Sequence, residues 1–465
     1  IGMSALALII SKRGHSVSGS DEKFSHGLQN LIAQGIIIYK SQIAANIDAI
    51  CSNQNCLPIV IVSTAIPATN PELRAAKNAG LKILHRSDLL ANLINNQTSI
   101  VVGGSHGKTT TSTIISTLLS LTNQDPTAVI GGIVPLYKSN GHSGKGKLLI
   151  AEADESDGTI IKLKGDLAII TNLELDHTNF YPDIKALIKT MKTFSHGSKR
   201  LLANYDCQKL KDNFNATFWW SIKNKDDVNF AAIPVSMNGK ETIANFYENG
   251  LFIGEIKIPL PGMHNLSNVT SAISACRIHG ISFSSLKKVL KNLKTPNRRF
   301  EFRGIWKERQ IIDDYAHHPS EISATISMSR LMLKSGKTNL PLEPKRLVAI
   351  FQPHRFSRTR DFLNDFAQAL QGADSIIIAP IFNAGEDPIL GINNQSLEKC
   401  IKKDNPLIPV STANNFNELI KLIQIHTKEG DLILNMGAGD INMLWENLQS
   451  ETTTNHKLSV YKRAA

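Results

Sequence analysis

Short apolar runs alternate with amphipathic stretches along almost the whole chain. Runs of strand length occur at 57–62, 99–102, 147–151 and 167–171. Strands buried on both faces of a parallel sheet have such nearly continuous apolar runs, because helices cover both faces. Helical periodicity separates the runs, for example at 108–121 and 184–195. The pattern therefore predicts βαβ units and an α/β fold.

The alternation of predicted strands and helices is interrupted at two places, and a third place shows a weaker boundary. From about 214 to 261 the chain reads as short strands separated by turn signals such as "MNGK" and "ENG", which predicts a small antiparallel β insert. The stretch "KTPNRRF" at 294–300 ends a helical pattern, and "INNQT" near residue 97 is a softer boundary. We expect three domains, and their predicted limits are 1–97, 98–296 and 297–465.

Strand-like runs resume in the last third of the chain. They lie near 310–313, 347–351, 375–380 and 431–435. A Gly turn in "LILNMGAGDI" precedes the last helix and is interpreted as structural. After about residue 450 the chain is polar, and we expect this tail to fray. The C-terminal domain is thus predicted to be a further Rossmann-like α/β unit.

The first residues, "IGMSALALII", resemble the end of a glycine-rich turn that runs into a helix. The next strand would be "HSVSGSD", with Asp21 at its end. In dinucleotide-type folds, an acidic residue about 20 positions after the glycines binds ribose hydroxyls. The strand and the leading glycines of such a turn are not in this sequence. We therefore expect a Rossmann-like N-terminal domain that is N-terminally incomplete.

The stretch "VVGGSHGKTTT" follows a predicted strand and opens a predicted helix. Backbone N–H groups and the helix dipole favour phosphate at such a position, and Lys108 can reach the β- and γ-phosphates of a nucleotide. The spacing departs from GxxxxGK[ST], because Val102 stands where the first glycine should be. The alternative is a glycine-rich turn with a solvated lysine. The residues expected to hold nucleotide phosphates here are Gly104, Ser105, His106, Gly107, Lys108, Thr109 and Thr110.

Two acidic stretches follow predicted strands. "LLIAEADESDG" ends in Glu152, Asp154, Glu155 and Asp157, and "LAIITNLELDHTNFY" contains His177. Carboxylates at the end of a parallel strand are well placed for a metal held against bound phosphates. The alternatives are a solvated acidic loop and a capped surface histidine. The Thr109 hydroxyl of the loop is a further candidate ligand for Mg²⁺.

Three further clusters carry candidate chemistry. In "LPGMHNLSNV", Asn265 and Asn268 either cap a helix or face a nucleotide, because an amide both donates and accepts. "IIDDYAHHPSEI" and "FQPHRFSRTRDF" follow predicted strands, and paired arginines there suit a carboxylate or a phosphate. The alternative for both stretches is a salt-bridged loop. The candidates in them are Asp314, Tyr315, His318, His354, Arg355 and Arg358.

Composition narrows the class of protein. The chain has 465 residues, a net charge of +11 and a pI near 9.3, yet no long basic run interleaved with aromatic residues, which argues against nucleic-acid binding. No apolar run approaches the roughly 20 residues of a membrane helix. The cysteines are scattered, which favours free thiols in a reducing cytoplasm. They are Cys51, Cys56, Cys207, Cys276 and Cys400.

Seven ordered stretches together resemble the Mur ligases, the ATP-dependent amide-forming enzymes of peptidoglycan synthesis. They are "GGSHGKTTT", "EADESDG", "NLELDH", "PGMHNLSN", "NRRFEF", "DDYAHHPSEI" and "FQPHRFSRTRDF". The resemblance implies ATP and Mg²⁺ as cofactors, with Mn²⁺ as a possible substitute, and it places Arg299 near ATP. It makes Lys108, His177, Arg299 and Asp314 the catalytic candidates, and it implies Thr109, Glu152 and His177 as the metal ligands. Substrate-binding candidates are Asp21, Ser63, Tyr315, His318, His354, Arg355 and Arg358.

Within this family, the last two stretches favour attachment of L-alanine to the lactyl carboxylate of UDP-N-acetylmuramate. The expected partners are therefore these two small molecules and ATP, and the expected state is a monomer or a weak homodimer. Two alternatives stay open. One is a sibling activity that reattaches a recycled tripeptide, and the other is a UDP-sugar-binding protein without turnover.

Overall fold

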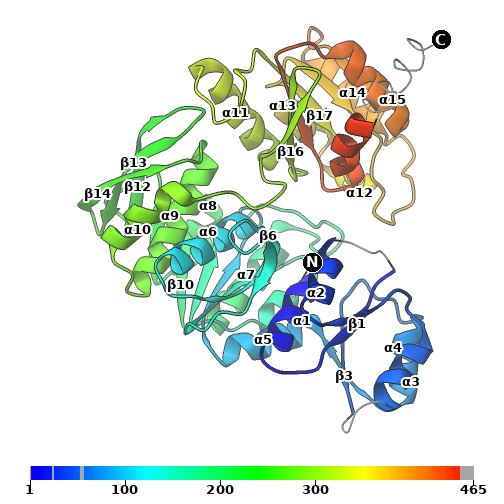
Figure 1. Ribbon diagram of the computed structural model, residues 1–465. Coiled ribbons are helices and arrows are strands. Elements are labelled where there is room, and N and C mark those ends of the chain that lie inside the picture. Colours follow the sequence, from blue (N-terminus) through cyan, green and yellow to red (C-terminus); the bar gives the residue numbers. More distant parts are fainter. Residues whose placement is uncertain (1, 23–25, 53–56, 451–465) are drawn as a thin grey trace, which may run out of the picture.

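The computed structural model describes residues 2–22, 26–52 and 57–450. Figure 1 shows three domains: blue elements at the lower right, cyan and green elements in the middle, and yellow to red elements at the top. The expected three-domain α/β fold is confirmed. The expected fraying of the tail after residue 450 and the thiol of Cys56 lie outside the described residues.

The N-terminal domain is built from two separate parallel pairs of strands, β1–β2 and β3–β4. Its first helix, α1, packs against β6 and β7 of the central domain, where Ala5, Leu6 and Ile9 are buried. A small cluster of Ile47, Ala76 and Leu81 fills the space near α3 and α4. The elements are α1 (Gly2–Lys12), β1 (Ser18–Ser20), α2 (His26–Ala33), β2 (Ile37–Tyr39), α3 (Ala44–Ser52), β3 (Ile59–Val62), α4 (Pro71–Asn78), β4 (Lys82–His85) and α5 (Arg86–Asn95).

The central domain holds a ten-stranded sheet in the order β14-β13-β12-β11-β10-β9-β5-β8-β6-β7. Successive residues of β5 enter different cores, because side chains alternate across a sheet. Ile100 and Val102 pack with α6 and α9, whereas Val101 packs on the other face, with α7. The parallel strands and the helices between and after them are β5 (Thr98–Gly103), α6 (Lys108–Leu121), β6 (Thr127–Val134), β8 (Leu148–Glu152), η1 (Thr159–Lys162), β9 (Leu167–Ile170), α7 (Ile184–Gly197), β10 (Arg200–Asn204) and α8 (Gln208–Asn213).

The antiparallel part of this sheet is smaller than the sequence predicts. The strand from "ATFWW", β11 (Phe218–Ser221), pairs parallel with both neighbours, so only β12 to β14 form an antiparallel meander. The meander continues the central sheet. The strand β7 pairs antiparallel with β6 at the opposite edge. The remaining elements are β7 (Ser139–His142), β12 (Phe230–Met237), β13 (Thr242–Glu248), β14 (Leu251–Ile258), α9 (Met263–Ile278), α10 (Phe283–Val289) and η2 (Leu290–Asn292).

The C-terminal domain has a six-stranded sheet in the order β15-β16-β20-β17-β18-β19, parallel except for β15. Buried aliphatic residues line both faces of the sheet, in line with the continuous apolar runs in the sequence. The elements are β15 (Glu301–Trp306), β16 (Arg309–Asp314), α11 (Pro319–Ser335), β17 (Arg346–Phe351), α12 (Phe356–Asp361), α13 (Leu363–Leu370), β18 (Ser375–Ile378), α14 (Asn394–Asp404), β19 (Val410–Thr412), α15 (Phe416–His426), β20 (Asp431–Met436) and η3 (Asp440–Met443).

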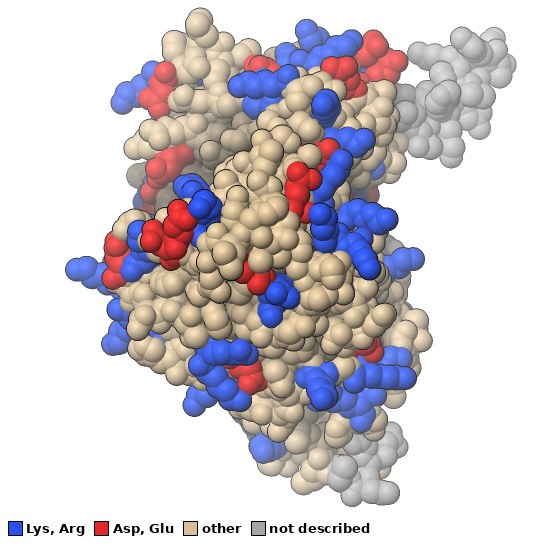
Figure 2. All heavy atoms as spheres, turned by 90° about the vertical axis from the view of Figure 1, so that its left-hand side faces the viewer, with Lys and Arg blue, Asp and Glu red and all other residues tan. Residues whose placement is uncertain are grey.

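The surface carries its positive charge in small groups. Figure 2 shows lysine and arginine side chains scattered over one face of the molecule, with acidic side chains among them. This face has no continuous basic stripe of the kind that follows a nucleic-acid backbone. Among residues 2–22, 26–52 and 57–450, no helix combines the length and apolar character that a membrane crossing requires. Four of the cysteines, Cys51, Cys207, Cys276 and Cys400, are free thiols.

Candidate functional site

The loop between β5 and α6 depends on two glycines in the left-handed region. Gly104 has φ +120° and Gly107 has φ +81°. A Cβ atom at Gly104 would lie 2.2 Å from the Thr171 hydroxyl oxygen, and one at Gly107 would lie 2.6 Å from Oδ1 of Asn268. Both positions therefore exclude a side chain by conformation and by space. The backbone passes directly beside β9 and α9, with α6 beginning at Lys108.

The Lys108 ammonium turns back onto this loop. It donates to the carbonyl oxygens of Gly104, at 2.7 Å, and Ser105, at 3.1 Å. It also forms an ion pair with Glu155 at 2.9 Å. Burial raises the pKa of Glu155 to about 7, against the opposing effect of Lys108. Sequence reasoning did not include Glu155 among the site residues, because four carboxylates in "EADESDG" offered no signal for which one meets the lysine.

Two of the three predicted metal ligands are in direct contact. The Thr109 hydroxyl donates to Oε1 of Glu152 at 2.8 Å, and the Gly131 N–H donates to Oε2 at 2.7 Å. His177, with φ +55°, lies instead beside Glu155, with Nε2 3.8 Å from Oε1. Burial lowers the pKa of His177 to about 4, so its imidazole is neutral at pH 7. The hydroxyl and carboxylate oxygens are hard donors that suit Mg²⁺ or Mn²⁺.

A cavity of about 540 Å³ lies between the central and C-terminal domains. Asn265 and Asn268 on α9 line it, but neither caps the helix, because the N-cap is Gly262 and makes no side-chain hydrogen bond. The capping alternative is therefore wrong. Asn265 donates to the Pro261 carbonyl oxygen at 2.8 Å. Other predicted residues on the cavity wall are His106, Gly107, Thr110, Arg299 and Asp314.

Asp314, at the end of β16, is buried on the C-terminal side of this cavity. Its carboxylate accepts hydrogen bonds from the backbone N–H groups of Phe300, at 2.7 Å, and Ala316, at 2.8 Å. Burial raises the pKa of Asp314 to about 6. The Arg299 guanidinium lies 5.3 Å from the centre of the Tyr315 ring, within cation–π range. The carboxylate thus fixes the linker backbone next to the arginine.

The predicted arginine cluster is salt-bridged in this arrangement. Arg358 on α12 donates through Nε to Asp176 of the central domain at 3.1 Å, and both side chains are only 7% exposed. Burial alone would raise the pKa of Asp176, but the Arg358 guanidinium holds it well below its usual value. His354 lies 3.2 Å from Arg358, while Arg355 pairs with Glu386 at 3.6 Å. The salt-bridge alternative therefore describes the contacts of both arginines.

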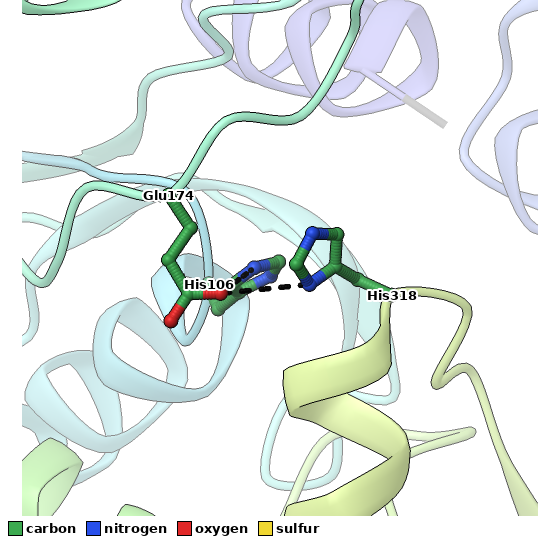
Figure 3. Close-up of side chains that lie close together, drawn as sticks. All are labelled: His106, Glu174 and His318. Atoms are coloured by element: carbon green, nitrogen blue, oxygen red, sulfur yellow. Dashed lines mark ion pairs between the residues drawn. The ribbon is translucent and has the colours of Figure 1, made fainter. Parts of the chain in front are cut away.

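His106, Glu174 and His318 converge from the phosphate loop, the segment after β9 and the start of α11 (Figure 3). Nε2 of His106 lies 3.4 Å from Oε2 of Glu174, and Nδ1 of His318 lies 3.5 Å from the same oxygen. His318 is the N-cap of α11 and accepts from the Ser320 N–H. Burial alone would lower the pKa of His106, but Glu321 and Glu174 raise it to about 9. Sequence reasoning proposed two of these residues but not their contact.

The N-terminal candidates lie apart from the phosphate loop. Asp21 follows β1 and Ser63 follows β3, so both stand at carboxyl ends of parallel strands. Contacts between this domain and the acidic segment come from residues that sequence reasoning missed. The Thr64 hydroxyl donates to Asp157 at 2.8 Å, and Arg86 lies 3.6 Å from Asp154. No spacing or motif in the sequence indicates these pairs.

The chain and its fold have counterparts among known proteins. Residues 1–98 match the Mur ligase family, catalytic domain, residues 102–276 match the Mur ligase middle domain, and residues 298–439 match the Mur ligase, glutamate ligase domain. The chain belongs to the Mur ligase family.

Curated relatives refine this comparison. The chain is 58% identical over 448 residues to UDP-N-acetylmuramate–L-alanine ligase of Prochlorococcus marinus strain MIT 9313, covering 96% of this chain and 92% of the relative. It is 54% identical to the enzyme of the same name from Synechococcus sp. strain CC9311, covering 97% and 93%. The crystal structure of UDP-N-acetylmuramate-alanine ligase MurC from Thermotoga maritima covers 98% of this chain and 97% of its own, with TM-score 0.79 and 23% identity.

Proposed function

We propose that this chain is an ATP-dependent ligase that joins L-alanine to the lactyl carboxylate of UDP-N-acetylmuramate in peptidoglycan precursor synthesis. The observation that carries the proposal is the 58% identity, over nearly the full length of both chains, to a curated UDP-N-acetylmuramate–L-alanine ligase. The geometry supports the same reaction, because a phosphate loop and a large interdomain cavity adjoin each other.

The chemistry requires an activated carboxylate. Hydroxide is too poor a leaving group for a carboxylate and an amine to condense in water. In the proposed first step, a lactyl carboxylate oxygen attacks the γ-phosphorus of ATP, and ADP leaves. The alanine amine then attacks the carbonyl carbon of the acyl phosphate, loses a proton, and inorganic phosphate leaves. The chain's own task is to orient the reactants and stabilise negative charge.

Lys108 is the proposed cation for the β- and γ-phosphates. In the arrangement described here its ammonium is bound by Gly104, Ser105 and Glu155. Phosphate oxygens would therefore replace Glu155 as its anionic partner. The raised pKa of Glu155, about 7, favours this exchange, because a protonated carboxyl group competes weakly for an ammonium. His106, Gly107 and Thr110 would complete the loop around ATP, with Asn265, Asn268 and Arg299 across the cavity.

Thr109 and Glu152 are the proposed ligands of Mg²⁺, which would supply electrostatic stabilisation of the transferred phosphoryl group. Their oxygens already lie 2.8 Å apart, so little rearrangement is needed for both to face one cation. His177 is a weaker fit to Mg²⁺, because imidazole nitrogen suits softer cations. We propose that the neutral His177 ring either stays beside Glu155 at the edge of the metal site or binds Mn²⁺ more readily than Mg²⁺.

The C-terminal domain is proposed to hold the amino acid and exclude water. The residues proposed for this role are Tyr315, His318, His354, Arg355 and Arg358. Of these, His318 contacts Glu174 and Arg358 contacts Asp176 of the central domain. An acyl phosphate hydrolyses if water reaches it, so docking of this domain protects the intermediate. Asp314 is proposed to act by fixing the linker that carries Arg299.

The N-terminal domain is proposed to bind the UDP part of the substrate, with Asp21 and Ser63 at the ends of β1 and β3. We propose domain limits at 1–97, 98–296 and 297–465. The sheets support these limits, because β5 opens the central sheet at Thr98 and β15 opens the last sheet at Glu301.

Phosphate release from this chain tests the proposal. With ATP and Mg²⁺ present, release is expected only when UDP-N-acetylmuramate and L-alanine are supplied together, and mass spectrometry should show the L-alanyl product. A panel of amino acids and the tripeptide L-Ala-γ-D-Glu-meso-diaminopimelate should give their best turnover with L-alanine. Activity with the tripeptide and none with L-alanine would identify the recycling activity instead. Binding of the UDP-sugar without any ATP-dependent product would leave only a binding protein.

A further inference from the structure

We propose that His106, Glu174 and His318 form a binding site for a transition-metal cation of the Zn²⁺ type, separate from the Mg²⁺ site proposed at Thr109 and Glu152. The three side chains offer ligand atoms that all lie within 4.8 Å of one another. Figure 3 shows the three side chains close together, with one Glu174 oxygen in ion-pair contact with both rings.

The spacing of the ligand atoms fits direct coordination. Two bonds of about 2.0–2.2 Å at a tetrahedral angle place their ligand atoms roughly 3.3–3.6 Å apart. The two nitrogen–oxygen distances here are 3.4 Å, from His106, and 3.5 Å, from His318. A cation beside Glu174 Oε2 would reach all three groups once the two ring nitrogens, which lie within 4.8 Å of each other, move closer together. Two imidazoles and one carboxylate suit Zn²⁺ far better than Mg²⁺.

The contacts of His106 orient it as a ligand. Nδ1 lies 3.2 Å from the Glu321 carboxylate and Nε2 faces Glu174. Nε2 is buried and makes no hydrogen bond in the described part of the chain. A cation would have to displace the proton that Nε2 shares with Glu174. His106 would then donate its Nδ1–H to Glu321 and present Nε2 to the metal, which is a common arrangement around zinc. Glu321 is in turn held by the backbone N–H of His317, at 3.1 Å.

His318 and Glu174 are also prepared for this role. His318 is only 5% exposed, and its Nδ1, which faces Glu174, accepts from the Ser320 N–H at 3.4 Å as the cap of α11. Ser320 donates to Oε2 of Glu174 at 2.6 Å, which fixes that carboxylate. A proton shared between His106 and Glu174 is the competing explanation for the cluster. That proton accounts for the His106 contacts, and the Ser320 hydroxyl, 2.8 Å from Nδ1 of His318 and bonded to Glu174, accounts for the position of His318. Zinc titration decides between the two explanations.

A cation in this position would link two domains. His106 and Glu174 belong to the central domain, whereas His318 begins α11 of the C-terminal domain. His106 and Glu174 also line the interdomain cavity. Bound Zn²⁺ would therefore hold the C-terminal domain against the phosphate loop and slow any step that needs the domains to separate.

Zinc titration of the intact chain in excess Mg²⁺ tests this site. Isothermal titration should give one Zn²⁺ per chain for the wild type. His318→Gln and Glu174→Gln should each lower the affinity more than about 100-fold, and Glu321→Gln about 10- to 100-fold, as expected for a residue that orients a ligand. His142→Gln is the matched control, because His142 also pairs with a carboxylate, Asp125, at 2.8 Å. It should bind Zn²⁺ like the wild type.

Cobalt substitution gives a second readout that does not depend on activity. Co²⁺ bound by two histidines and a carboxylate should show the intense visible absorption of a four-coordinate site, and His318→Gln should abolish it. Circular dichroism establishes that each variant is folded. Unchanged Zn²⁺ affinity in both ligand variants would overturn the proposal. Loss of Zn²⁺ binding in His177→Ala, with His318→Gln unaffected, would place the cation at the Mg²⁺ site and overturn it equally.

Discussion

Two groups of charged side chains flank the phosphate loop, and they differ in where their partners come from. Lys108 and Thr109 pair with Glu155 and Glu152, all within the central domain. His106 on the same loop instead pairs with Glu321 of the C-terminal domain. The first group is formed whenever the central domain is folded, whereas the second is formed only when two domains are docked. Phosphate binding and domain closure are therefore served by separate contacts a few residues apart.

The largest effect is expected where the interdomain contact is most buried. Arg358→Ala leaves the buried Asp176 carboxylate without its guanidinium partner, which costs about 3–5 kcal/mol while the domains stay docked. The variant should shift toward separated domains, visible as a larger radius of gyration in small-angle scattering. Arg360→Ala is the control, because Arg360 is exposed and pairs with the adjacent Asp361 of its own helix. Identical scattering from the two variants would mean that Arg358 does not hold the domains together.

Lys108→Ala should remove the lysine from the group of contacts within the central domain, without disturbing the docking of the C-terminal domain. Loss of one preorganised cation at the transferred phosphate is expected to lower the rate of ligation by about 10²- to 10³-fold, or roughly 3–4 kcal/mol. The scattering profile should stay that of the wild type. Lys199→Ala, at an exposed lysine paired with Asp166, should keep full activity. Turnover of the Lys108 variant at the wild-type rate would refute the role proposed for the loop.

Substitution of a glycine in the phosphate loop is expected to have a somewhat smaller effect, seen as a loss of unfolding free energy. Gly104→Ala combines a left-handed backbone with a Cβ atom 2.2 Å from the Thr171 hydroxyl, so a loss of about 2–3 kcal/mol in unfolding free energy is expected. Gly391→Ala has φ +81° and no neighbour within 4 Å, so it measures the backbone strain alone, about 1 kcal/mol. Urea unfolding compares the two. Equal losses of unfolding free energy would show that Thr171, which follows β9, shifts easily and that its close approach to residue 104 does not matter.

The smallest effect concerns pH at the cavity wall. Burial, with a contribution from Arg299, lowers the pKa of His264 to about 4. When the pKa of a histidine is lower in the folded state, the histidine stabilises the fold at pH values above its pKa in the unfolded chain, near 6.5. This stabilisation is lost as the pH falls toward 4. The loss reaches about 1 kcal/mol at pH 5.5. Urea midpoints of the wild type and His264→Gln should therefore converge as the pH falls from 7.5 to 5. Parallel curves would show that His264 does not titrate in this range.

Local signals in the sequence predicted the parts of the fold that depend on local order. The helix at 108–121 has the same limits in the structure, because the glycines and the threonine run fix its start. Pairing between distant strands was less predictable. The aromatic run "ATFWW" suggested an antiparallel strand, yet β11 lies parallel to β10 and β12. Side-chain composition does not encode strand direction, which depends on the connection between the strands.

The candidate site shows the same division. The phosphate loop and the Thr109–Glu152 contact follow from residues at the ends of adjacent parallel strands, which the motifs indicate. The pair of Arg358 and Asp176 joins residues 182 positions apart, in different domains, and no periodicity reports such a contact. The same holds for His106 and His318. Motifs identified the reactive side chains, but only domain docking decides which of them meet.

The cavity between the central and C-terminal domains has a pharmacological consequence. Its wall is shared, with Asn268 on one side and Asp314 on the other, so it exists only in docked molecules. A small molecule that fills it must select that conformation, and its apparent affinity falls in proportion to the docked fraction. Inhibitors found by screening the free enzyme and inhibitors found under turnover would then rank differently. Any condition that favours docking of the two domains would raise the apparent affinity of every compound in such a series by the same factor.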